Sequence, residues 1–259
     1  MGRRPLKRHV QQELPKTRKR DKNGQFRGGA RKGAGRPKRK ISEGRSSESH
    51  KVRPKLKASQ PVHVVLRASS DVGSLRSPEG FAAVREARLS TLRLEDSFRI
   101  IHFSIQRNHI HLLVEAHDRK ALWKAMQVFG ISCAKQLNAA LSATRGKRRR
   151  GGVFTDRYYA RILKTPREVR NCLAYVLNNW RHHEVESAEW MGQEWKKVDP
   201  FSSALAFDGW KERPEGKRFK IPPEYEGSWI WLPRTWLVTT GWRRHGLISI
   251  HEIPGGGDE

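Results

Sequence analysis

Hydrophobic residues gather in two kinds of segment along this chain, short β-branched runs and longer stretches with helical spacing. The short runs are residues 61–67, 98–105 and 109–115. Runs of this length and composition predict strands. A three-residue polar turn at 106–108 separates the second run from the third and predicts a hairpin. A fourth strand is expected within residues 153–163.

Three further segments carry apolar residues at the spacing of a buried helix face. The first spans residues 81–92, and the second follows Asp118, whose carboxylate suits a helix N-cap. The third spans Pro166–His183, with Thr165 as N-cap and a proline at the first helical position. Its buried stripe consists of Val169, Cys172, Leu173, Val176, Leu177 and Trp180.

The elements follow the order strand, helix, strand, strand, helix, strand, helix. The first six predict an α+β fold, a ferredoxin-like βαββαβ sheet with helices on one face. The third strand of such a sheet lies centrally, and we expect the last helix to cross the sheet edge near it. We predict that residues 58–185 form this domain. Residues 186–259 form a C-terminal extension, packed on the domain or partly irregular, in which 236–239 and 246–250 predict short strands or turns.

Positive charge is concentrated at the start of the chain. Residues 1–60 hold 21 Lys and Arg against 4 Asp and Glu, a net of +17 out of +27 for the whole chain. Residues 1–57 lack apolar periodicity, so we expect a disordered basic arm that binds a polyanion, most commonly nucleic acid. Its Gly35-Arg36-Pro37-Lys38 segment resembles an AT-hook, which lays arginine into the narrow minor groove of A·T-rich DNA. A solvated basic tail explains the same residues equally well.

Two cysteines, Cys133 and Cys172, fall within predicted helices and cannot form a disulfide framework. We expect them to be free and buried, and a reducing cytoplasm to be the compartment. No run approaches the ~18 apolar residues that a membrane span needs. We therefore expect no membrane partner.

The third predicted strand carries two histidines, His109 and His111, separated by one apolar residue. Side chains alternate across a strand, so both imidazoles project from one face while Ile110 projects from the other. Two imidazoles at this spacing can bind a metal ion together. An exposed strand face that carries two histidines by chance is the simpler alternative.

The last predicted helix carries Asn171, Tyr175 and Asn179 at intervals of four residues, along one flank of its buried stripe. Beside a bound divalent cation, a tyrosine phenol can attack a phosphodiester and form a phosphotyrosine. An ordinary half-buried tyrosine with its hydroxyl in water would show the same pattern.

Three motifs together resemble the single-tyrosine HUH transposases, also called insertion-sequence-200-like transposases, and above all their REP-associated (RAYT) branch. The motifs are His109–Glu115, Val153–Arg161 and Thr165–Asn179, and the resemblance covers about residues 60–185. It implies that His109 and His111 bind Mg²⁺ or Mn²⁺ and that Tyr175 is the nucleophile. It also implies cleavage of single-stranded DNA beside a hairpin, giving a 5′-phosphotyrosine and a free 3′-OH.

The resemblance places Asn179 as the third metal ligand, where the best-known members have glutamine. Tyr158 and Tyr159 are rival nucleophiles by residue type, but they lie in a predicted strand rather than on the helix. Basic residues outside the arm suit phosphate contacts, and a solvated basic loop is the equal alternative. These residues are Arg107, Arg148, Arg149 and Arg157.

We therefore predict a metal-dependent tyrosine transposase that nicks and rejoins single-stranded or hairpin DNA, in the bacterial cytoplasm at the nucleoid, as a monomer or a homodimer. The first alternative is a non-catalytic or domesticated nucleic-acid-binding protein that retains the fold. The second is a metal-dependent nuclease that uses water in place of tyrosine.

Overall fold

The computed structural model of the chain describes residues 22–23, 52–182, 198–213, 219 and 230–253. The chain divides into two compact units, Met1–Ser46 and Ser47–Glu259, and the second is described below. Most of the expected basic arm lies outside the described residues, including Arg36 and Lys38.

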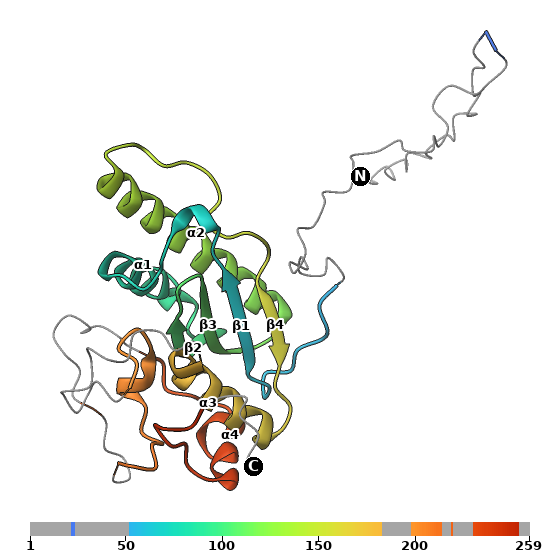
Figure 1. Cartoon of the computed structure of the whole chain (residues 1–259). Helices are drawn as coiled ribbons and strands as arrows, with labels where there is room; N and C mark the ends of the chain where they lie inside the picture. Colours follow the sequence, from blue (N-terminus) through green and yellow to red (C-terminus); the bar gives the residue numbers. More distant parts are fainter. Residues whose placement is uncertain (1–21, 24–51, 183–197, 214–218, 220–229, 254–259) are drawn as a thin grey trace, which may run out of the picture. The chain divides into compact units, whose positions relative to one another are not determined.

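The second unit is built around a four-stranded antiparallel sheet (Figure 1). Its strands are β1 (Val62–Arg67), β2 (Phe98–Ile105), β3 (His109–Ala116) and β4 (Tyr159–Ile162). They lie in the order β2-β3-β1-β4, so β1 and β3 are central. This is the strand order of a βαββαβ ferredoxin-like sheet, and the expected fold class is confirmed.

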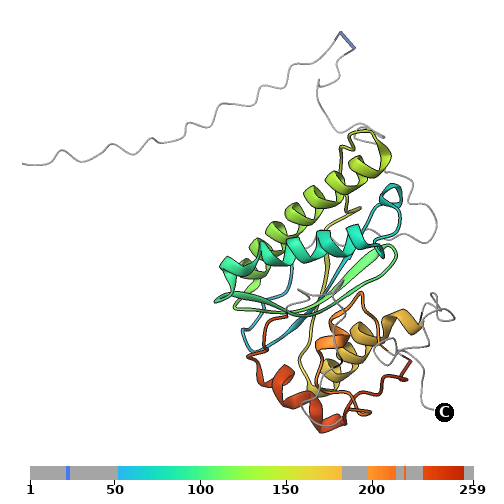
Figure 2. The same cartoon turned by 90° about the vertical axis from the view of Figure 1, so that its left-hand side faces the viewer.

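Two helices cover the first face of the sheet, α1 (Pro78–Leu89) and α2 (Arg119–Arg145) (Figure 2). Asp118 caps α2 as expected, accepting a hydrogen bond from the amide of Ala121 at 2.8 Å. The apolar residues of β1 and β3 pack against these helices to form the first core: Val62, Val64, Leu66, Ile110, Leu112 and Val114.

Helix α1 begins three residues before the predicted start at position 81. The Ser77 hydroxyl accepts a hydrogen bond from the amide of Gly80, and Pro78 occupies the first helical position. A serine cap followed by a proline is typical of a helix start, so the apolar spacing alone set the predicted start too late. The helix also ends earlier than predicted, because Leu92–Leu94 form a separate 3₁₀ turn.

Helix α3 (Pro166–His182) covers part of the second face of the sheet (Figure 2). Its N-terminus is a capping box, in which Thr165 Oγ1 accepts from the Glu168 amide at 3.2 Å and the Glu168 carboxylate accepts from the Thr165 amide at 3.0 Å. The helix packs against β2 and β3, where Ile101 and Leu113 join its apolar stripe in the second core. Helix α3 therefore lies over the face of the sheet. The expectation from the sequence that it crosses the sheet edge is wrong.

Residues 198–213 and 230–253 complete the second core, with Trp210 and Trp242 almost fully buried. The prediction of a strand or turn at 236–239 is wrong, because Trp236–Thr239 form the helical turn α4. The Glu115 carboxylate, at the end of β3, accepts hydrogen bonds from the amides of Arg234 and Thr235 and stabilises the start of this turn. No described helix is long and apolar enough to cross a membrane.

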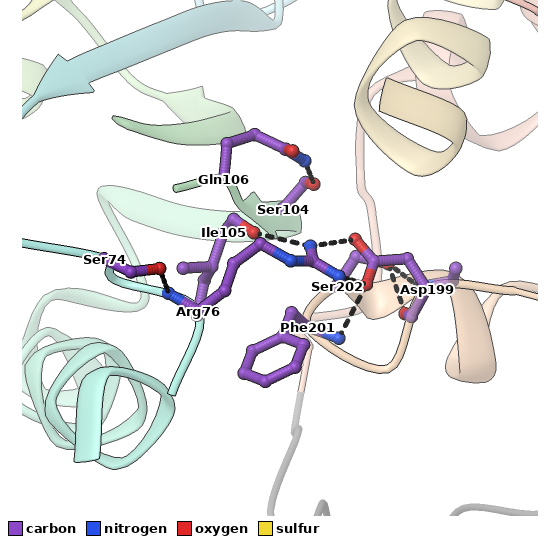
Figure 3. Close-up of polar contacts among 9 residues, drawn as sticks. Ser74, Arg76, Ser104, Ile105, Gln106, Asp199, Phe201 and Ser202 are labelled. Atoms are coloured by element: carbon purple, nitrogen blue, oxygen red, sulfur yellow. Dashed lines mark hydrogen bonds and ion pairs between the residues drawn. The ribbon is translucent and has the colours of Figure 1, made fainter. Parts of the chain in front are cut away.

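A buried ion pair joins the loop before α1 to the C-terminal extension (Figure 3). The Arg76 guanidinium donates to both carboxylate oxygens of Asp199, at 3.0 and 2.9 Å, and to the carbonyl of Ile105 at 2.9 Å. The amide of Ile105 in turn donates to the carbonyl of Phe201 at 2.8 Å. Residues 199–203 are thereby held along the outer edge of β2.

Candidate active site

The two histidines of β3 lie on the second face of the sheet, at its centre. His109 pairs with Arg67 and His111 with Val65 on β1, and their rings meet edge to face with centroids 4.6 Å apart. His111 is buried and His109 is half-buried. The Nδ1 atom of His109 lies 2.6 Å from the side-chain oxygen of Asn108. In this arrangement the Nδ1 proton is donated to Asn108, and the lone pair of the neutral ring resides on Nε2.

A third histidine, His63 on β1, lies directly beside this pair. Its Nε2 is 3.1 Å from Nδ1 of His111, and the two rings stack with centroids 5.2 Å apart. Burial, together with the positive charge of Arg161 and the neighbouring imidazole of His109, lowers the pKa of His63 to about 4. His63 was not among the site residues predicted from the sequence. Its signal was the strand alternation itself, because β1 and β3 are neighbours in a βαββαβ sheet and odd positions of β1 share the face of His109 and His111.

Tyr175 reaches the histidines from α3. Its ring meets His111 edge to face with centroids 5.2 Å apart, and it meets His63 in the same manner at 5.9 Å. The tyrosine is half-buried, so its ring is held while part of it remains accessible. The structure therefore brings together, within a single chain, the predicted nucleophile and one of the two histidines predicted to bind the metal.

The rival tyrosines lie elsewhere. Tyr158 packs against the first core with the Arg53 guanidinium 4.0 Å from its ring centre, and burial raises the pKa of its phenol. Tyr159 is exposed on β4, two strands away from His111 in the sheet.

Asn179 lies one helical turn after Tyr175 and is fully buried. The exposure of the polar flank falls along α3, from exposed Asn171 through half-buried Tyr175 to buried Asn179. Among the described residues, neither the amide oxygen nor the amide nitrogen of the Asn179 side chain has a hydrogen-bond partner. A buried amide in this state costs about 1–3 kcal/mol, which a ligand to its oxygen would recover.

The match to known families decides how these residues are interpreted. The family model for IS200-like transposases matches residues 59–179, which span β1 to Asn179. These residues are an IS200-like transposase domain. No sequence among curated proteins matches the chain.

Two solved structures are similar to the chain that carries this transposase domain. One is a REP-associated tyrosine transposase bound to a REP hairpin, with 17% identity and a TM-score of 0.42, covering 60% of this chain and 82% of the other. The second is a candidate transposase from Deinococcus radiodurans R1. It has 11% identity and a TM-score of 0.34, covering 46% of this chain and 87% of the other.

The arginines of the transposase domain that were predicted to contact phosphates differ in their exposure and in the residues they contact. Arg107 and Arg148 are exposed, and Arg157 is half-buried. The Arg149 side chain is only 7% exposed, and its guanidinium donates to the Asp71 carboxylate at 2.6 Å and to Asn138. Arg149 thus fastens the loop after α2 to the loop after β1.

Proposed function

We propose that this chain is a transposase that cuts and rejoins single-stranded DNA through Tyr175, with a Mg²⁺ or Mn²⁺ ion held by His109 and His111. The observation that supports this most directly is the edge-to-face contact of Tyr175 with His111, at 5.2 Å, within one chain of an IS200-like transposase domain. A nucleophile beside a metal ligand is the arrangement that phosphodiester transfer requires.

The reaction proposed is a transesterification. The Tyr175 phenol loses its proton as its oxygen attacks the phosphorus, and the bond from phosphorus to the 3′ oxygen breaks. The leaving 3′ oxygen takes up a proton and becomes a free 3′-OH, while the 5′-phosphate stays on Tyr175. One phosphodiester is exchanged for another, so a 3′-OH can later attack the phosphotyrosine and reseal a strand.

The donor set near Tyr175 fits a divalent ion that is also bound by its substrate. The Nδ1 atoms of His109 and His111 lie within hydrogen-bond distance of Asn108 and His63, which favours Nε2 of each ring as the ligand atom. Asn179 supplies a buried amide oxygen without a hydrogen-bond partner in the described part of the chain. Within that part, no three His, Cys, Asp or Glu side chains are grouped to hold a metal. The proposed site therefore consists of two imidazoles and one amide, and when bound the ion would neutralise charge on the phosphate.

The proposed substrate is single-stranded DNA next to a hairpin. The support is the resemblance of the three sequence motifs to the REP-associated branch of the family, together with the net charge of +27, which favours a polyanionic partner.

The test uses the full chain, Mn²⁺ and a library of single-stranded DNA in which randomised sequence flanks a stem-loop. With the label on the 3′ end of the DNA, cleavage through tyrosine should transfer the label to the protein on a denaturing gel. With the label on the 5′ end, the same reaction should release a shorter DNA with a 3′-OH. Tyr175→Phe should abolish both products, whereas Tyr158→Phe and Tyr159→Phe should retain the adduct.

Each other result contradicts the proposal in a different way. Cleavage by Tyr175→Phe without an adduct would indicate a nuclease that uses water. Binding without any cleavage by the unaltered chain would favour the non-catalytic DNA-binding alternative. An adduct that persists in Tyr175→Phe and disappears in Tyr159→Phe would show that Tyr159, and not Tyr175, is the nucleophile.

A further inference from the structure

We propose that the half of the sheet formed by β1 and β4 is a platform for single-stranded DNA, on which Tyr159 stacks with a base while Arg67 and Arg161 bind phosphates. The inference rests on the proposed function, because it concerns the strand that would lead to Tyr175. It gives a binding role to Tyr159 and Arg161, which lie within the second sequence motif, and adds Arg67, which lies outside all three motifs.

The second face of the sheet has two halves with different surroundings. Over β2 and β3 it is covered, because α3 and the C-terminal residues pack there around Ile101 and Leu113. None of the residues of β1 or β4 belongs to this second core. Their inward side chains join the first core on the opposite face. Of their outward side chains, His63, which lies beside α3, and Val65 are half-buried, whereas Arg67, Tyr159 and Arg161 are exposed in the described structure and form the open part of this half.

The strand register aligns the outward side chains of β4 and β1 with the histidines of β3, in rows across the sheet. Tyr159 pairs with Val65, and Val65 pairs with His111. In the next row Arg161 pairs with His63. Arg67 pairs with His109 at the other end of β1. Adjacent strands lie about 4.8 Å apart, so the backbone at Tyr159 is about 10 Å from that at His111.

The exposed groups on this half suit a single strand. Tyr159 is 44% exposed, and among the described residues it is the only large hydrophobic side chain on a strand that is exposed to this degree. Arg67 is exposed, and the Arg161 side chain is 57% exposed. One guanidinium nitrogen of Arg161 lies 3.5 Å from Glu168, and an exposed pair of this kind is weak enough to be exchanged for a phosphate.

An exposed aromatic ring between two arginines favours single-stranded over duplex DNA. Bases in a duplex are already stacked on one another and cannot stack on a protein ring without being unpaired, whereas unpaired bases can. A strand that lies across β4 and β1 would reach the histidines and Tyr175 at the border between the two halves. The platform thus provides a path for the strand toward the proposed nucleophile.

Binding is measured by fluorescence anisotropy with the full chain in EDTA, using a labelled single-stranded oligonucleotide without a stem-loop and its duplex as competitor. Tyr159→Ala should weaken binding about tenfold without changing its salt dependence, and Tyr159→Trp should restore it. Arg67→Ala and Arg161→Ala should each lower the slope of log affinity against log salt by about 0.7. The matched controls are Trp123→Ala and Lys124→Ala, exposed residues of α2 on the opposite face, which should bind as the unaltered chain does.

Photocrosslinking locates the contact. An oligonucleotide with 5-iodouracil should crosslink to the peptide that contains Tyr159. Equal affinity of Tyr159→Ala and the unaltered chain, a crosslink at Trp123 instead, or equal affinity for single strand and duplex would each overturn the platform. Because metal and cleavage play no part in this experiment, the platform can fail while the Tyr175 adduct forms, and the adduct can fail while the platform binds.

Discussion

His63 and His111 are joined through their rings, with Nε2 of His63 3.1 Å from Nδ1 of His111. A histidine that binds a metal through Nε2 carries its proton on Nδ1 and donates it to a neighbour. His63 is in the position of that neighbour, one strand away from the predicted ligand and in contact with the Tyr175 ring. The relationship makes His63 a candidate positioning residue for the site.

The first prediction concerns this hydrogen bond. His63→Phe removes the acceptor and should lower Mn²⁺ affinity about 10- to 100-fold, the range typical of such neighbours. His63→Gln places an amide oxygen near the former Nε2 and should retain most of the affinity. Electron paramagnetic resonance titration of free Mn²⁺ measures both. His117→Phe, at an exposed histidine just after β3, is the control, and equal affinities of all four proteins would refute the role of His63.

The second prediction concerns the two neighbouring asparagines of α3. Asn179→Leu replaces a buried amide without a partner in the described structure, so the metal-free protein should be as stable as before or about 1–3 kcal/mol more stable. Its Mn²⁺ affinity should fall. Asn178 is equally buried, but its amide donates to the carbonyl of Ser249 at 2.9 Å, so Asn178→Leu should destabilise by about 1 kcal/mol. Urea unfolding in EDTA compares the two, and loss of stability in Asn179→Leu alone would contradict the interpretation.

The third prediction concerns the ion pair of Arg76 with Asp199. The Asp199 side chain is fully buried, so Arg76→Met would leave its carboxylate buried without its counter-charge and should cost about 3–5 kcal/mol in the free energy of unfolding. The control is the exposed pair of Arg85 with Glu86, where Glu86→Gln should cost about 1 kcal/mol or less. A cost in Arg76→Met as small as in this control would show that the buried pair does not hold the C-terminal extension.

The fourth prediction concerns the cysteines, which are free and buried, as the sequence predicted. Burial raises the pKa of both the Cys133 and the Cys172 thiol to about 12. Thiols with a raised pKa stay protonated at pH 8, and only the thiolate reacts. Iodoacetamide should therefore modify neither cysteine in the native chain and both in urea, as measured by intact mass. Rapid modification of the native chain would contradict the burial of that thiol.

Local patterns in the sequence were sufficient to predict most of the domain. The β2–β3 hairpin, the Asp118 cap and the capping box at Thr165 depend on residues within a few positions of one another, so the sequence displays them directly. The same holds for the placement of His109 and His111 on one face of a strand.

Contacts between distant segments could not be predicted in this way. His63 meets His111 only because β1 and β3 pair in one particular register, which strand composition does not specify. Helix α4 is a single turn whose start is stabilised by Glu115, more than a hundred positions earlier. Arg149 was predicted to contact DNA because it lies in a basic run, and its bond to Asp71 depends on the folded loops.

The segment along β2 also limits how copies of this protein can associate. The hydroxyl of Ser203 accepts from the amide of Phe103 and donates to its carbonyl, while the carbonyl of Phe201 accepts from the amide of Ile105, so the outer backbone groups at the end of β2 are already occupied. In the described structure β4 pairs only with β1. Because residues 199–203 obstruct the β2 edge, a second copy would extend the sheet more readily at β4, so two copies could join β4 to β4 and then stop. Growth into an open-ended polymer would first require residues 199–203 to detach.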